Sequence, residues 1–167
     1  MSSTISPAQW AALTPPERAG IWSAAELLPQ TGPMCLLNEV IEISDTGAVS
    51  GALIPESGLL VDKGFFAPEG MIEIMAQTVG LFAGARSRAA GDPVRPGLLL
   101  GTRRLTLPQS PVPAGSKLIT TAQEVFSDAD GLWQFSCIVS LDEKPIAEAV
   151  LTLYAPAADY FNPYKQS

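Results

Sequence analysis

Apolar residues gather in a few runs along the chain, separated by short turn-forming segments. The first two runs, residues 36–43 and 48–54, flank Ser44-Asp45-Thr46-Gly47 and predict a β-hairpin. Four further runs of strand type come later, with Pro, Gly and Asp between them. They span residues 98–107, 117–126, 132–141 and 146–154.

The segment between these two groups, residues 68–86, predicts a long buried helix. Pro68 suits the first helical turn, and the ionisable residues before Arg86 are Glu69 and Glu73. A helix that is apolar on nearly every face has to be covered by other elements. One side differs, because small and polar residues recur there at spacings of three and four. They are Gly70, Glu73, Gln77, Gly80 and Gly84. This side allows close approach of a ligand or another backbone, and we favour close packing of the helix against a sheet.

The order of elements favours one α+β domain, in which an antiparallel sheet packs on the single long helix. We divide the chain into an N-terminal arm at residues 1–25, a domain at 26–156 and a C-terminal tail at 157–167. The arm is expected to be peripheral and to hold a short helix or two. Thr14, followed by two prolines and Glu17, has the sequence of a capping box.

Composition and charge exclude several classes of function. The net charge is −7 and the few basic residues form no stripe, so we expect no nucleic-acid partner. Cys35 and Cys137 lie in apolar segments, and with no histidine in the chain we expect reduced thiols and no metal site. We find no signal sequence and no run of roughly 18 apolar residues, which favours the cytoplasm without membrane attachment.

Two segments carry a family resemblance, which extends over residues 26–155. Leu28-Pro29-Gln30-Thr31-Gly32-Pro33-Met34 precedes a strand with Asn38 near its centre, and the helix contains Gly70-Met71-Ile72-Glu73-Ile74-Met75-Ala76-Gln77-Thr78. Together they resemble the hot-dog dehydratases of the beta-hydroxyacyl-carrier-protein type. The nearest match is the divergent branch found with aryl polyene and similar lipid-like, fatty-acid-related biosynthesis.

The resemblance implies a hot-dog fold, in which a strongly curved antiparallel sheet wraps the long helix. Such proteins dimerise, as homodimers or hot-dog heterodimers, with an acyl tunnel along the interface. They are lyases that need no cofactor and remove water from a 3-hydroxyacyl thioester of acyl carrier protein or coenzyme A. The resemblance assigns acid–base work to a helix glutamate, matched here by Glu73, and to a histidine from the loop before the helix.

This sequence departs from that pattern at the histidine. The loop at residues 59–66 offers Asp62 and Lys63 as its ionisable groups, and Gln30 stands where many relatives have the histidine of an LPH sequence. Dehydration needs a base, an acid and hydrogen-bond donors for the enolate oxygen. An apolar surrounding favours the neutral form of Glu73, which can donate a proton to the leaving hydroxyl. Asp62 is the candidate base, provided that its loop folds over the helix.

We predict four substrate-binding residues beside this catalytic pair, which are Gln30, Gly70, Met71 and Gln77. The amides of the first helical turn are expected to be free to polarise a thioester carbonyl.

Three functions remain open at this stage. The first is a dehydratase with Glu73 as its acid–base group. The second is a non-catalytic acyl binder, or a heterodimer subunit whose partner supplies the histidine, with Glu73 and Gln77 as a polar pair at the interface. The third and weakest is an acyl-thioester hydrolase, because Glu73 would then have to act as a base. Whether the chain is an enzyme is therefore left open.

Overall fold

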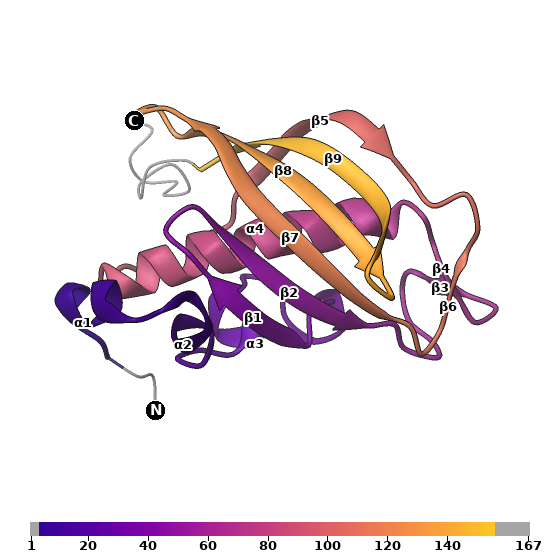
Figure 1. Ribbon diagram of the computed structural model, residues 1–167, viewed down its shortest axis with the longest axis horizontal. Helices are drawn as coiled ribbons and strands as arrows, with labels where there is room; N and C mark the ends of the chain where they lie inside the picture. The colour runs from indigo at the N-terminus through magenta and orange to yellow at the C-terminus, as the bar shows by residue number, and fades with distance from the viewer. Residues whose placement is uncertain (1–3, 156–167) are drawn as a thin grey trace, which may run out of the picture.

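The computed structural model describes residues 4–155 and shows a curved antiparallel sheet wrapped around one long helix (Figure 1). The helix is α4, Gly70–Ala89. The order of strands in the main sheet is β1-β2-β7-β8-β9-β5, and every neighbouring pair is antiparallel. These strands are β1 (Glu39–Ile43), β2 (Gly47–Leu53), β5 (Leu98–Thr106), β7 (Lys117–Ser127), β8 (Leu132–Leu141) and β9 (Lys144–Tyr154). The predicted hot-dog fold is confirmed, and so are its six strands.

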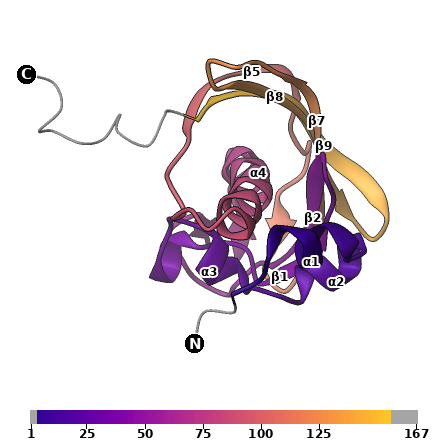
Figure 2. The same ribbon diagram turned by 90° about the vertical axis from the view of Figure 1, so that its left-hand side faces the viewer.

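The core lies between α4 and the concave face of the sheet. Met71, Ile74 and Leu81 of α4 are fully buried, and the view in Figure 2 shows the sheet arching over the helix. Phe82 packs against Trp133 and Phe135 of β8, with ring centroids 5.8 and 5.7 Å away. Each such side chain contributes about 1.5–3 kcal/mol through burial, which is why the helix carries apolar residues on so many faces.

The glycine-rich side of α4 packs closely, but its main partner is not the sheet. A Cβ atom on Gly84 would lie 2.1 Å from the carbonyl oxygen of Leu27, and one on Gly80 would lie 2.8 Å from Leu28 Cδ2. Leu27 ends the short helix α3 (Ala24–Leu27), which therefore rests on α4. The prediction of close packing is confirmed, and its partner is corrected to the N-terminal segment.

Alanine substitutions distinguish these two contacts. Gly84→Ala should lower the free energy of unfolding by about 2 kcal/mol, because overpacking against a backbone atom outweighs the gain of about 1 kcal/mol in helix propensity. Gly80→Ala should be close to neutral, since the end of the Leu28 side chain can rotate away. Urea unfolding of both variants gives the comparison, and equal losses would contradict a contact that depends on the Leu27 backbone.

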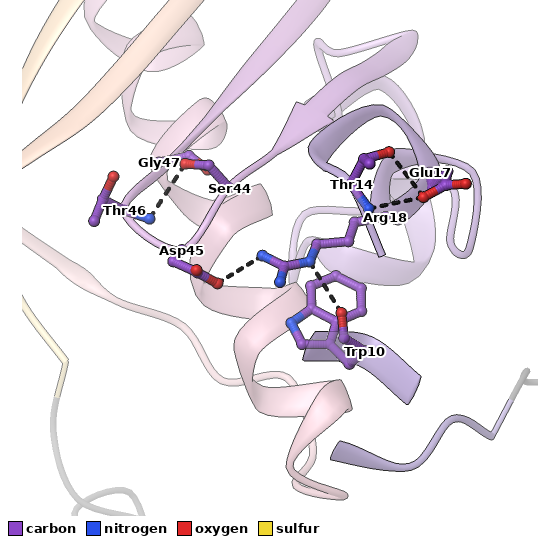
Figure 3. A network of polar contacts seen from close by, with 8 residues as sticks. All are labelled: Trp10, Thr14, Glu17, Arg18, Ser44, Asp45, Thr46 and Gly47. Carbon is purple, nitrogen blue, oxygen red and sulfur yellow. Dashed lines mark hydrogen bonds and ion pairs between the residues drawn. The ribbon is translucent and has the colours of Figure 1, made fainter. Parts of the chain in front are cut away.

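The N-terminal arm is fixed to the hairpin of β1 and β2 through Arg18 (Figure 3). Arg18 is 5% exposed, its Nη1 lies 2.7 Å from Asp45 Oδ1, and its Nε donates to the carbonyl of Trp10 at 3.1 Å. Its guanidinium also lies 5.0 Å from the centre of the Trp10 ring. Trp22 is buried as well, so the expectation of a peripheral arm is wrong for this part.

Short helices account for much of the arm. They are α1 (Pro7–Ala12), α2 (Pro15–Ala19) and α3. The predicted capping box at Thr14 is confirmed, since its amide and hydroxyl both donate to Glu17 at 2.8 Å. Both bonds lower the pKa of the Glu17 carboxyl below its ordinary value, and the bond from the Thr14 amide has the larger effect. The predicted C-terminal tail lies outside the described residues.

A second sheet of three two-residue strands lies near the start of α4, and the sequence pattern did not predict it. It consists of β3 (Val61–Asp62), β4 (Phe65–Phe66) and β6 (Val112–Pro113). Lys63 and Gly64 form the turn between β3 and β4 with positive φ angles of 51° and 79°. In residues 4–155, no helix is long and apolar enough to cross a membrane.

Candidate functional site

Gln77 joins the two segments that carry the family resemblance. Its side chain is buried and makes three hydrogen bonds. Oε1 accepts from the amide of Leu36 at 2.9 Å, while Nε2 donates to the carbonyl of Met34 at 2.7 Å and to Glu73 Oε1 at 2.9 Å. The segment around Met34 is thereby held on the helix one turn from Glu73.

A tight turn precedes the backbone groups that bond to Gln77. Gly32 has a φ of 55° and begins the 3₁₀ helix η1 (Gly32–Met34), which is closed by a bond from the Cys35 amide to the Gly32 carbonyl. A positive φ of this kind favours glycine. Asn38, which is part of the same resemblance, accepts from the amide of Leu53 at 2.6 Å. It therefore connects the start of β1 to the end of β2.

Glu73 is half-buried and borders a cavity of about 510 Å³, a volume within the usual range for small-molecule sites. One of its carboxylate oxygens is held by Gln77. No lysine or arginine of residues 4–155 forms an ion pair with this carboxylate. A carboxyl group placed in this way can exchange a proton with a molecule in the cavity.

The cavity follows α4 from Glu73 towards the end of the helix. Its helical wall is a stripe of small residues, four and three positions apart. They are Ala76, Gly80, Ala83, Ser87 and Ala90. Leu99 of β5, Trp133 of β8 and Leu153 of β9 form the opposite wall. This stripe shares Gly80 with the glycine-rich side predicted from the sequence, and Glu73 and Gln77 of that side also line the cavity. The regular spacing of small residues is the signal that could have revealed the cavity.

The remaining predicted residues are not all brought to the cavity. Gln30 lines it, and its Oε1 is buried without a hydrogen-bond partner among the described residues. Asp62 is exposed on β3 and is not part of the lining. Gly70 lies under the Phe66 ring, and Met71 is fully buried in the core.

The first turn of α4 also differs from expectation. The amide of Gly70 donates to the Ala67 carbonyl at 2.9 Å, and that of Met71 donates to the Pro68 carbonyl at 3.1 Å. Two of the amides expected to be free are thus already bonded within the turn. The carbonyls of the loop before α4 accept these bonds, and the residue pattern alone does not reveal this.

The thiols and acidic side chains offer no second reactive centre in the described part of the chain. Burial raises the pKa of Cys137 to about 12, so this thiol stays protonated at neutral pH. Cys35 is half-buried and is not part of the cavity lining. No group of three or more metal-ligating side chains lies in residues 4–155. Besides Glu73, the ionisable residues that line the cavity are Arg86, Asp92, Arg95 and Tyr154.

Comparison with solved structures gives hot-dog proteins. A dehydratase heterocomplex, ApeI:P from Xenorhabdus doucetiae, matches with 24% identity and a TM-score of 0.75, covering 82% of this chain and 93% of that one. A hypothetical thioesterase with coenzyme A from Streptococcus pneumoniae TIGR4 matches with 14% identity and a TM-score of 0.55, covering 70% and 83%. The PaaI protein of the E. coli phenylacetic acid degradation operon matches with 12% identity and a TM-score of 0.55, covering 70% and 81%. No curated protein matches the sequence.

The curved sheet and the central helix that it wraps define a hot-dog protein. A family model decides the particular family, because it matches residues 22–164. The chain belongs to the ApeP-like family, described as ApeP dehydratase. The resemblance found in the sequence is confirmed.

Proposed function

We propose that this protein binds a 3-hydroxyacyl or enoyl thioester in the cavity along α4, and that Glu73 transfers the proton in the loss or addition of water. The observation that supports this most directly is the Glu73 carboxylate, held by Gln77 at 2.9 Å on the border of a cavity of about 510 Å³. In its protonated form, the Glu73 carboxyl can donate a proton to the leaving hydroxyl from the oxygen not bound by Gln77, and the resulting carboxylate recovers a proton from water.

The base for the second proton transfer comes, in this proposal, from a second hot-dog chain. Asp62 is exposed and away from the cavity of its own chain. A second copy can bring its own Asp62 to Glu73, or a different hot-dog chain can bring a histidine. The ApeI:P structure is a heterocomplex, which is consistent with the latter arrangement.

Strand β5 is the surface proposed to bind that second chain. It pairs with β9 on one side, and among residues 4–155 no strand pairs with its other edge. Leu98, Leu99, Leu100 and Leu105 are exposed on it, by 37, 42, 58 and 39%. An open edge with apolar side chains readily pairs with another strand. Because Leu99 also lines the cavity, a chain bound there would help to enclose the substrate.

A charge in this edge should separate the two chains. Leu100→Asp is expected to raise the dissociation constant of the dimer at least about tenfold, because a carboxylate would be desolvated at the interface. Sedimentation of the purified protein over a concentration series measures this. Val125→Asp is the matched control, since Val125 is 57% exposed on β7, which has paired strands on both sides. An unchanged dimer in the Leu100 variant would contradict pairing through this edge.

A non-catalytic subunit is the second candidate function. The separation of Asp62 from the cavity favours it, because the base predicted for this chain then lies away from Glu73. Such a subunit would bind the acyl chain or complete the site of a catalytic partner.

One assay separates these functions. The chain is purified alone and together with a histidine-containing hot-dog chain, and each sample receives crotonyl thioesters of coenzyme A and of acyl carrier protein. Loss of the enoyl absorbance by the chain alone supports the dehydratase, and activity only in the mixed sample supports the subunit. Release of free thiol would indicate a thioesterase, and turnover in neither sample would contradict the proposal. The carrier and the cytoplasmic location remain predictions from the sequence.

A further inference from the structure

The end of the cavity far from Glu73 is cationic. Arg86 of α4 and Arg95, in the loop before β5, both line it. Arg86 is exposed and Arg95 is half-buried. A chain of methylene groups makes no favourable contact with a cation. These two side chains therefore indicate that a different chemical group binds at this end.

Neither guanidinium is neutralised within the described part of the chain. No carboxylate of residues 4–155 forms an ion pair with Arg86 or Arg95. Asp92 also lines this end but pairs with neither, and Asp45, which borders a smaller neighbouring cavity with Arg86, is bound by Arg18. Unpaired guanidinium groups in a cavity favour an anion, because their N–H groups match its oxygen atoms.

Trp133 lies beside one of these groups. The guanidinium of Arg86 lies 5.9 Å from the centre of the Trp133 ring. Stacking on an aromatic face leaves the N–H groups at the edge of the guanidinium available for a ligand. Contact with Trp133 therefore leaves the donors of the arginine available.

We propose that Arg86 and Arg95 bind an anionic group of the same substrate whose thioester lies at Glu73. This inference rests on the proposed function and adds the chemical class of the substrate's distal end. Glu73 and Arg86 are thirteen positions apart, which is about 20 Å along the helix axis. Both side chains point back towards the start of the helix, and because arginine is the longer of the two, its guanidinium comes somewhat closer than this.

Two parts of an acyl thioester can supply the anion at such a distance. One is the phosphate of the pantetheine arm, about thirteen bonds from the sulfur, or about 15 Å at the advance of an extended peptide backbone. The other is an acidic group at the far end of a long acyl chain. The wall between the two ends is formed by Ala76, Gly80 and Ala83, which leaves room for an extended chain of either kind.

Binding of two pairs of unreactive thioesters distinguishes these sources. Butyryl-4′-phosphopantetheine is compared with butyryl-pantetheine, and the dodecanedioyl thioester of pantetheine with its dodecanoyl thioester. Isothermal titration gives the dissociation constants. In one of the two pairs, the anionic ligand should bind about tenfold more tightly than its uncharged partner, and this preference should weaken at high salt. The pair that shows the preference identifies the source of the anion.

Substitutions then assign the preference to the two arginines. Arg86→Gln and Arg95→Gln should each reduce it to about twofold, whereas Arg86→Lys should retain part of it because the charge remains. Lys144→Gln, a change of equal charge at the exposed first residue of β9, should leave it intact. The anion site is wrong if neither pair shows a preference, or if the preference survives loss of both arginines. Hydration of crotonyl thioesters that persists in that case would leave the proposed function standing. Failure of all four thioesters to bind would overturn both proposals.

Discussion

Replacing Glu73 by glutamine should lower kcat/KM for the hydration of a crotonyl thioester by at least about a hundredfold, since a positioned acid–base group contributes 10²–10⁴. The amide has nearly the shape of the carboxyl group, and its oxygen can still accept the bond that Gln77 donates to Glu73 Oε1. The fold and the cavity are therefore expected to persist while proton transfer is lost. The rate of loss of the enoyl absorbance, measured in the assembly that shows activity, gives the comparison.

Glu69→Gln is the matched control for this experiment. Glu69 precedes α4 at its N-cap, is exposed and does not line the cavity. Its replacement removes the same charge near the same end of the helix and should change kcat/KM by less than about twofold. Unaltered hydration in the Glu73 variant would show that this carboxyl transfers no proton. An equal loss in both variants would point to net charge as the cause.

The pattern of apolar residues was sufficient for the main elements of the fold. The β8 strand was predicted at its observed limits, and the bounds of α4 differ by two or three residues at each end. Long runs succeed because each places many apolar side chains on one buried surface. The strands β3, β4 and β6 have two residues each and present no period that a sequence can reveal.

The candidate site was predicted only in part, and the reasons lie in contacts between distant segments. Glu73 and Gln77 were found because one helix places them a turn apart, and that relation is local. The position of Asp62 depends on how a loop folds, and two short strands turn it towards solvent. Arg86 and Arg95 became visible only when the cavity wall was known. The burial of Arg18 likewise depends on Asp45, which lies 27 positions further along the chain.

Replacing Gln77 by leucine should lower the free energy of unfolding by about 3 kcal/mol. Leucine has a similar size but cannot bond to the Met34 carbonyl or the Leu36 amide, and a buried backbone group without a partner costs about 1–3 kcal/mol. The loss is large beside the 5–15 kcal/mol of a typical domain. Urea unfolding measures it, and hydrogen exchange at the Leu36 amide reports directly on the contact.

Gln123→Leu provides the comparison for this variant. The Gln123 side chain donates to Thr46 Oγ1 at 2.8 Å, but it is exposed, so water can replace the bond. This change should cost less than about 1 kcal/mol. A Gln77 variant as stable as the Gln123 variant, with unchanged exchange at Leu36, would mean that the segment at residues 34–36 is held on α4 by other contacts. If the predicted difference is found, Gln77 both fixes that segment and orients Glu73, so the variant should lose hydration activity together with stability.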